Sequence, residues 1–115
     1  MGDVVRLLAC ALSVLPLGCK RGDAGAPPEA RAEELYRVNC AGCHGLKGQG
    51  PMFAAPPGGG PPPPRNFTDP AFQSSRSDAE LRRVIVEGRG AMPPFGKLFS
   101  EQELDLLVKK IRSFK

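Results

Sequence analysis

Two cysteines and one histidine form the part of this sequence that could carry chemistry. Cys40, Cys43 and His44 stand in the pentapeptide CAGCH, and C-x-x-C-H is the pattern by which a c-type haem is attached. Residues three and four apart share one face of a helical turn. Both thiols can therefore reach the vinyl groups of one porphyrin while His44 points its imidazole at the iron. The motif predicts one haem c per chain, bonded to Cys40 and Cys43 and ligated by His44.

Two other uses of such a motif fit the sequence less well. A zinc site would need further Cys or His ligands, but His44 is the only histidine, and the other cysteines, Cys10 and Cys19, lie near the N-terminus. A thioredoxin-like redox pair would need a βαβ context, which the sequence does not show. We therefore favour haem attachment.

The second axial ligand of the iron has to be a residue other than histidine. Apart from Met1, the chain offers Met52 and Met92. Met52 follows His44 by only eight residues and would have difficulty reaching the opposite haem face. Met92 lies in GRGAMPPFG, where glycines let the backbone turn and two prolines stiffen it. Since Met/His ligation is typical of cytochromes c, we expect Met92 to be the sixth ligand; a methionine can also simply fill a core.

The N-terminal segment indicates export. Arg6 is followed by an apolar run from Leu7 to Leu17, which is too short to span a membrane and fits a secretory signal peptide at residues 1–18. Gly18-Cys19 resembles a lipoprotein cleavage site, although Pro16 stands where such sites usually have leucine. The segment predicts a lipid on Cys19 and anchoring at the periplasmic face of a bacterial membrane; an ordinary signal would leave a soluble periplasmic protein.

The residues after Cys19 divide into a tether and one small domain. Residues 19–31 are polar and rich in Gly, Ala and Pro, which predicts a flexible tether, and residues 32–115 form the domain. This domain has no Trp, one Tyr and six Phe, so a large apolar prosthetic group would supply much of its core. A formal charge of +4 is well short of a nucleic-acid-binding composition.

The periodicity predicts an all-α domain with four helical segments. The first runs from about Glu29 into the cysteine motif, with Leu35, Tyr36 and Val38 as packing residues. A short helix begins after Asp69-Pro70. Two longer ones open at capping boxes, which are Ser77 with Glu80 and Ser100 with Glu103. Gly88 ends the former, and the latter carries an apolar stripe of Leu104, Leu107, Val108 and Ile111.

From about Ala32 to Phe114 the chain resembles a class I cytochrome c, of the bacterial type related to the c-haem subunits of terminal oxidases. The matching segments are ELYRVNCAGCHGLKGQG, PPRNFTDPAF, AELRRVIVEGRGAMPPF and FSEQELDLLVKKIRSF. The resemblance implies crossed N- and C-terminal helices, with haem in a slot. It also implies that a proline carbonyl, from Pro51, Pro56 or the run Pro61–Pro64, accepts the ring N–H of His44.

The function that follows is single-electron transfer, with no catalytic residues. Expected partners are a quinol-oxidising complex on one side and a terminal oxidase or reductase on the other, together with the membrane surface and without nucleic acid. Arg65 and Asn66 could bind a haem propionate or be ordinary loop residues. A haem-based sensor is one alternative, although it would require a signalling domain, which this sequence does not include. A dedicated electron-entry subunit of a larger oxidoreductase is the other.

Overall fold

The computed structural model describes residues 25–51 and 57–115. Within these residues all regular structure is helical apart from an isolated bridge between Arg89 and Met92, so the predicted all-α fold is confirmed. The described residues form the helices α1 (Pro28–Asn39), α2 (Ala41–His44), α3 (Pro70–Ser75), α4 (Asp78–Glu87) and α5 (Glu101–Ser113). No helix in the described ranges is long and apolar enough to cross a bilayer.

The first helix begins with a proline inside the segment whose composition predicted a tether. Pro27 precedes the helix and Pro28 is its first residue, a position where the missing N–H of proline costs nothing. Arg31, also within that segment, forms an ion pair with Glu103 of α5. Helix α1 therefore begins within the segment assigned to the tether, one residue before the start near Glu29 that the periodicity predicted.

The two capping boxes fix where the longest C-terminal elements begin. The Ser77 hydroxyl accepts the Glu80 N–H while the Glu80 carboxylate accepts the Ser77 N–H, and Ser100 and Glu103 repeat the arrangement at α5. Each box satisfies N–H groups that a helix start otherwise leaves unpaired. Asp69 likewise caps α3 by accepting the Ala71 N–H. The helix starts predicted at these three positions are confirmed.

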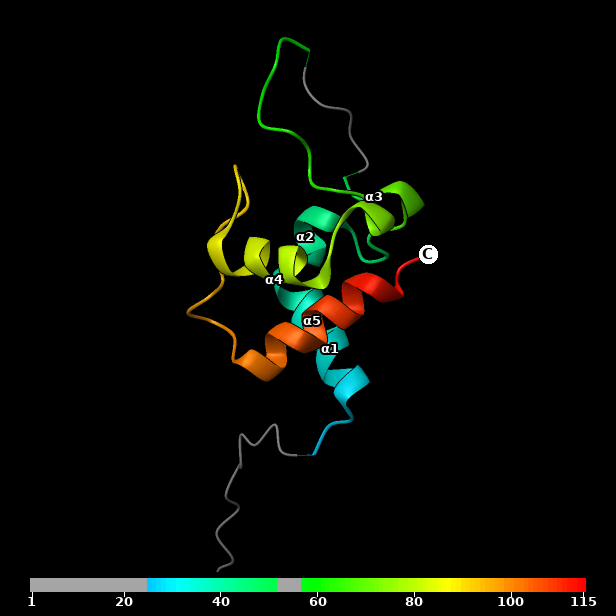
Figure 1. Cartoon of the computed structure of the whole chain (residues 1–115), viewed down its shortest axis with the longest axis vertical. Coiled ribbons are helices and arrows are strands. Elements are labelled where there is room, and N and C mark those ends of the chain that lie inside the picture. Colours follow the sequence, from blue (N-terminus) through cyan, green and yellow to red (C-terminus); the bar gives the residue numbers. More distant parts are fainter. Residues whose placement is uncertain (1–24, 52–56) are drawn as a thin grey trace, which may run out of the picture.

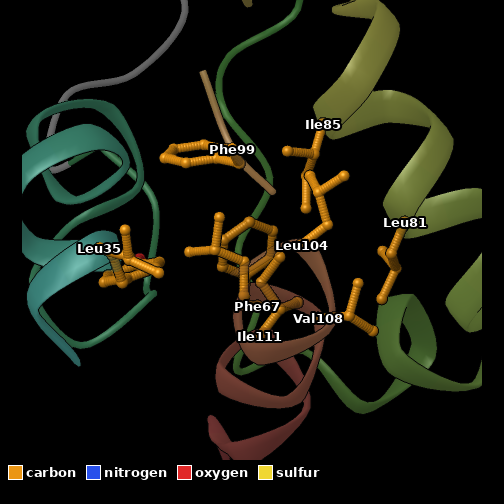
Figure 2. Packing of buried hydrophobic residues seen from close by; sticks show 10 residues of the cluster. Leu35, Phe67, Leu81, Ile85, Phe99, Leu104, Val108 and Ile111 are labelled. Atoms are coloured by element: carbon orange, nitrogen blue, oxygen red, sulfur yellow. The ribbon is translucent and has the colours of Figure 1, made fainter. Parts of the chain in front are cut away.

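Within the described part of the chain, one hydrophobic cluster joins α1, α4 and α5. In Figure 1 the C-terminal helix α5 lies across α1, and these two helices form the main interhelical contact. Side chains from all three helices point toward one another around Phe67, which comes from the loop before α3 (Figure 2). The side chains of Tyr36, Leu104 and Leu107 are fully buried. The apolar stripe predicted on α5 is buried as expected.

One of the predicted packing residues lies at the surface. Val38 is 62% exposed, whereas Leu35 and Tyr36 of the same helix are buried. The prediction for Val38 was wrong, because three consecutive turns of α1 present only one face to α5 and Val38 falls outside that face.

Candidate functional site

The CAGCH motif occupies the junction between α1 and α2. Cys40 ends α1, where its N–H donates to the Tyr36 carbonyl. The N–H groups of Cys43 and His44 both donate to the Cys40 carbonyl, at 3.2 and 2.9 Å. One tight helical turn therefore carries Cys40, Cys43 and His44, as the sequence predicted. Both cysteines have free thiols rather than a disulfide.

The Cys40 thiol is held in its neutral form. Burial and the neighbouring Cys43 thiol raise the pKa of Cys40 to about 11. Disulfide exchange requires a thiolate, so this environment is unlike that of a thioredoxin-type cysteine. Across residues 25–51 and 57–115, no three His, Cys, Asp or Glu side chains gather as zinc ligands would.

His44 is oriented by two contacts from one distant segment. Its Nδ1 lies 3.1 Å from the carbonyl oxygen of Arg65, and its ring stacks on the Phe67 ring with 4.4 Å between centroids and 18° between planes. Burial lowers the pKa of the imidazole, and the hydrogen bond to the Arg65 carbonyl acts in the opposite direction. With Nδ1 donating to that carbonyl, Nε2 remains as the nitrogen that can ligate a metal.

The carbonyl that holds His44 differs from the one that the resemblance implied. A proline carbonyl was expected, but the acceptor belongs to Arg65, the residue after Pro64. The acceptor is therefore the residue directly after the last proline of the run Pro61–Pro64. Sequence reasoning also missed Phe67, because its role depends on a contact between residues 23 positions apart in a loop without periodicity.

Tyr36 connects the core to the end of α2. Its ring is fully buried and lies 4.9 Å from the Phe114 ring, and its hydroxyl donates to the Gly45 carbonyl at 2.8 Å. Burial raises the pKa of the hydroxyl well above its usual value, so it remains a donor. Tyr36 fills the helix interface, as predicted, and also fixes the residue that follows His44.

Met92 lies in a loop that folds back on the end of α4. The backbone N–H and carbonyl groups of Arg89 and Met92 pair with each other at 3.0 Å in both directions. Further along, the Phe95 and Gly96 N–H groups donate to the Ile85 and Val86 carbonyls, which satisfies the last turn of α4. The loop is therefore fixed at both ends.

The two parts of the predicted site border the same core. Cys40 and Met92 are both half-buried and pack against the single hydrophobic cluster, Cys40 from the α1–α2 junction and Met92 from the loop after α4. The lipid site predicted at Cys19 lies outside the described residues, as do Cys10 and Met52, the methionine that was set aside in favour of Met92. Arg65 and Asn66, the possible propionate ligands, are exposed, as are the cationic residues Lys47, Arg89 and Lys97. The Asn66 side chain accepts from the N–H and hydroxyl of Thr68.

The residues present fit a covalently attached haem. Two free thiols and an imidazole share one helical turn, the imidazole has a fixed Nδ1 hydrogen bond, and a thioether lies in a braced loop on the same core. Thioether attachment needs the cysteines, and iron accepts both imidazole and thioether ligands. Residues Cys40 and Cys43 would hold the porphyrin, and His44 and Met92 the iron.

Comparisons with known proteins relate the chain to c-type cytochromes. The family described as cytochrome c oxidase, cbb3-type, subunit III matches residues 27–109, a span that includes CAGCH and the Met92 loop. A solved structure described as the KustC0563 c-type cytochrome has 30% sequence identity and a TM-score of 0.61 over 73% of this chain and 96% of its own. The structure of a tyrosine-to-phenylalanine mutant of Kustc0563 has 29% sequence identity and a TM-score of 0.60. That match covers 74% of this chain and 99% of the mutant's chain. No curated protein sequence matches the chain.

Proposed function

Because the chain belongs to the c-type cytochrome family described as cytochrome c oxidase, cbb3-type, subunit III, we propose that it carries single electrons on one haem c. We assign Cys40 and Cys43 to the thioether bonds and His44 and Met92 to the iron. The family implies covalently bound haem and haem-based electron transfer.

The observation that supports the assignments best is the pairing of His44 with the Arg65 carbonyl. A metal-ligating histidine usually donates its other ring N–H to a carbonyl or carboxylate, which fixes its tautomer and orientation. The 3.1 Å contact supplies that partner, and the Phe67 ring restricts rotation of the imidazole. An isolated surface histidine would need neither contact.

Met92 is suited to the sixth position by its chemistry and by the stiffness of its loop. When bound, haem c supplies one-electron chemistry, because its iron alternates between the ferric and ferrous states. The Met92 thioether would favour the ferrous state and raise the potential, and His44 with Met92 would leave no position for a substrate. A carrier is therefore favoured over an enzyme.

The site of action follows from the N-terminal sequence. We place the domain at the periplasmic face of a bacterial membrane, held there by a lipid on Cys19, because residues 1–18 resemble an export signal. Electrons would come from a quinol-oxidising complex and go to a terminal oxidase or reductase. The exposed cations beside the ligand segments, which are Lys47, Arg89 and Lys97, would suit acidic partner surfaces.

A second candidate function is a fixed electron-entry subunit of one larger oxidoreductase. The family description, which names a subunit of an oxidase, favours it. The two possibilities can be distinguished by solubilising native membranes in mild detergent and separating the proteins by size. The position of the haem then shows the size of the particle that contains it. A free carrier migrates alone, whereas a subunit comigrates with the other chains of its enzyme.

The experiment that tests haem attachment uses the full chain expressed with a haem-attachment system. Its mass should exceed that of the apo chain by one haem, and the denatured protein should retain the colour. Replacing Cys40 and Cys43 by Ala should abolish attachment, whereas the matched control Cys19→Ser should keep it. Haem that extracts completely from the wild type into acidified organic solvent would contradict the proposal.

A further inference from the structure

The segment that orients His44 is itself fixed through the backbone of Phe67. The Phe67 N–H donates to the Gly48 carbonyl at 2.6 Å. On the other side, the Phe67 carbonyl accepts from the side-chain Nε2 of Gln73 at 2.7 Å. The two contacts to His44, from the Arg65 carbonyl and the Phe67 ring, therefore depend on where these backbone hydrogen bonds hold residues 65–67.

Gln73 joins this segment to the C-terminal helix. Its Nε2 also donates to the Ile111 carbonyl at 2.8 Å, and its Oε1 accepts from Nη1 of Arg112 at 3.0 Å. The nitrogen and the oxygen of the Gln73 side-chain amide are therefore both hydrogen-bonded, and the side chain is half-buried. Gln73 thus bridges the loop before α3 and the last turns of α5.

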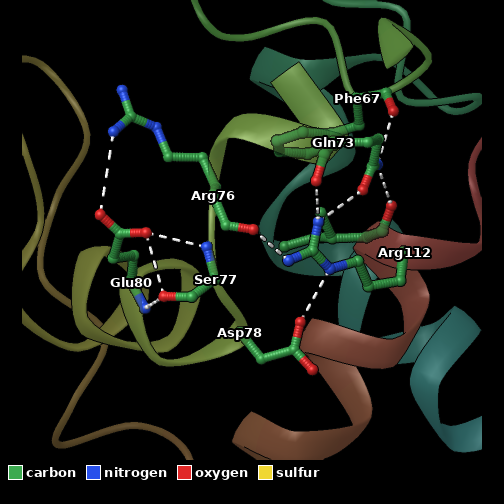
Figure 3. A network of polar contacts seen from close by, with 8 residues as sticks. Phe67, Gln73, Arg76, Ser77, Asp78, Glu80 and Arg112 are labelled. Carbon is green, nitrogen blue, oxygen red and sulfur yellow. Dashed lines mark hydrogen bonds and ion pairs between the residues drawn. The ribbon is translucent and has the colours of Figure 1, made fainter. Parts of the chain in front are cut away.

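Arg112 holds Gln73 and its surroundings in place. Its Nη1 donates to the Gln73 carbonyl at 2.6 Å, its Nε donates to the Asp78 carboxylate at 2.8 Å, and its Nη2 donates to the Arg76 carbonyl. Figure 3 shows the guanidinium enclosed by these groups, with Gln73 between it and Phe67. The guanidinium is a rigid planar fork, so several bonds made at once fix the position of Gln73.

We propose that Gln73 and Arg112 are positioning residues for the iron ligand His44, acting through Phe67. The inference deepens the proposed function, on which it rests, because it gives His44 an outer shell that extends to α5. Contacts of this kind set the orientation of a ligating imidazole. The pair would keep the His44 plane in one orientation relative to the haem.

The chain offers a matched control for a purely structural effect. Arg82 of α4 also bonds to α5, through Asp105 at 2.6 Å and through the carboxylate of Glu101. The Arg82 side chain is 28% exposed, as is that of Arg112. Among the described residues, the hydrogen bonds and ion pairs of Arg82 go to Glu101 and Asp105 and none goes to residues 65–67. Loss of either arginine should weaken the attachment of α5, but only loss of Arg112 should change the orientation of the His44 imidazole.

The test compares Arg112→Met, Gln73→Glu and Arg82→Met as haem-loaded full chains. Gln73→Glu keeps an acceptor for Arg112 but removes the donor to Phe67. NMR of the reduced protein follows solvent exchange of the His44 Nδ1–H, and NMR of the oxidised protein gives the spread of the haem methyl shifts, which reports the imidazole plane. Exchange should be roughly tenfold faster or more in the first two variants, with an altered methyl spread. Arg82→Met should match the wild type in both.

The outcomes distinguish failure of the positioning role from failure of the proposed electron-carrier function. If Arg112→Met and Gln73→Glu lower only the midpoint of thermal unfolding, as Arg82→Met does, the positioning role is refuted and the electron carrier stands. If the wild-type haem shows no histidine ligation by His44, both are refuted. A changed methyl spread in Gln73→Glu with an unchanged unfolding midpoint would support the inference most directly.

Discussion

Gly88 lies against the backbone of Met92 so closely that a Cβ added to Gly88 would come within 2.6 Å of the Met92 carbonyl oxygen. Gly88 also has a φ of +73°, a conformation that a side chain disfavours. Gly90, two residues on, has a φ of +59°, but an added Cβ there would meet nothing within 4 Å. Gly88 therefore allows the Met92 loop to pack closely against the end of α4, whereas Gly90 only allows the backbone to turn.

These two glycines give a matched pair of substitutions. Gly90→Ala should cost about 1 kcal/mol of unfolding free energy, from backbone strain alone. Gly88→Ala should cost more and also displace Met92, which would weaken the near-infrared charge-transfer band between sulfur and ferric iron. Urea unfolding and the optical spectrum of the oxidised protein measure the two effects. Equal spectra for the two variants would show that close packing at Gly88 does not hold the ligand loop.

Replacing Met92 by Ala should remove the near-infrared band altogether. It should also lower the potential and let carbon monoxide bind the ferrous protein, because the soft thioether stabilises ferrous over ferric iron and a water or hydroxide does not. Optical titration against redox mediators measures the potential. Met52→Ala is the control and should leave all three properties nearly unchanged. A wild type that already binds carbon monoxide readily would favour sensing or catalysis.

The capping box of α5 should contribute stability that depends on pH. Ser100→Ala should lower the free energy of unfolding by about 1 kcal/mol. Ser74→Ala is the control and should change it little, because the Ser74 hydroxyl bonds only within α3. The hydrogen bond from the Ser100 N–H, with the Arg31 contact second, holds the pKa of Glu103 below its usual 4.5. The stability that the ionised Glu103 carboxylate contributes is therefore complete above about pH 4.5. It declines as the pH falls through the lowered pKa that Glu103 has in the folded protein.

A pH series of unfolding measurements on Glu103→Gln checks that sign. The difference in unfolding free energy between the wild type and this variant should be constant near neutral pH and shrink below about pH 4.5. A difference that grows in acid would mean that the carboxylate is not stabilised in the folded protein.

Anchoring is tested at Cys19. Cells grown with labelled palmitate should label the wild-type protein, and Cys19→Ser should abolish labelling and release the protein into the soluble fraction. Cys10→Ser, within the predicted signal, is the control and should leave labelling intact. A mature N-terminus found by mass spectrometry at another residue, without label, would indicate a soluble periplasmic carrier.

The sequence alone determined the features that depend on neighbours along the chain. The shared turn of Cys40, Cys43 and His44 follows from spacings of three and four residues. The starts of α4 and α5 follow from the Ser77 and Ser100 capping boxes, each closed within three residues. Such interactions form inside one helical turn, so the order of residues is enough to specify them.

The surroundings of those features depend instead on contacts between residues far apart in the sequence. The carbonyl that holds His44 comes from Arg65, 21 positions away, and Arg112 reaches Gln73 across 39 positions. No local pattern encodes either contact, because both depend on how α5 packs and on the path of a loop without periodicity. The outward position of Val38 has the same origin. Burial is decided by which face of α1 meets α5, and a hydrophobic side chain alone does not determine that face.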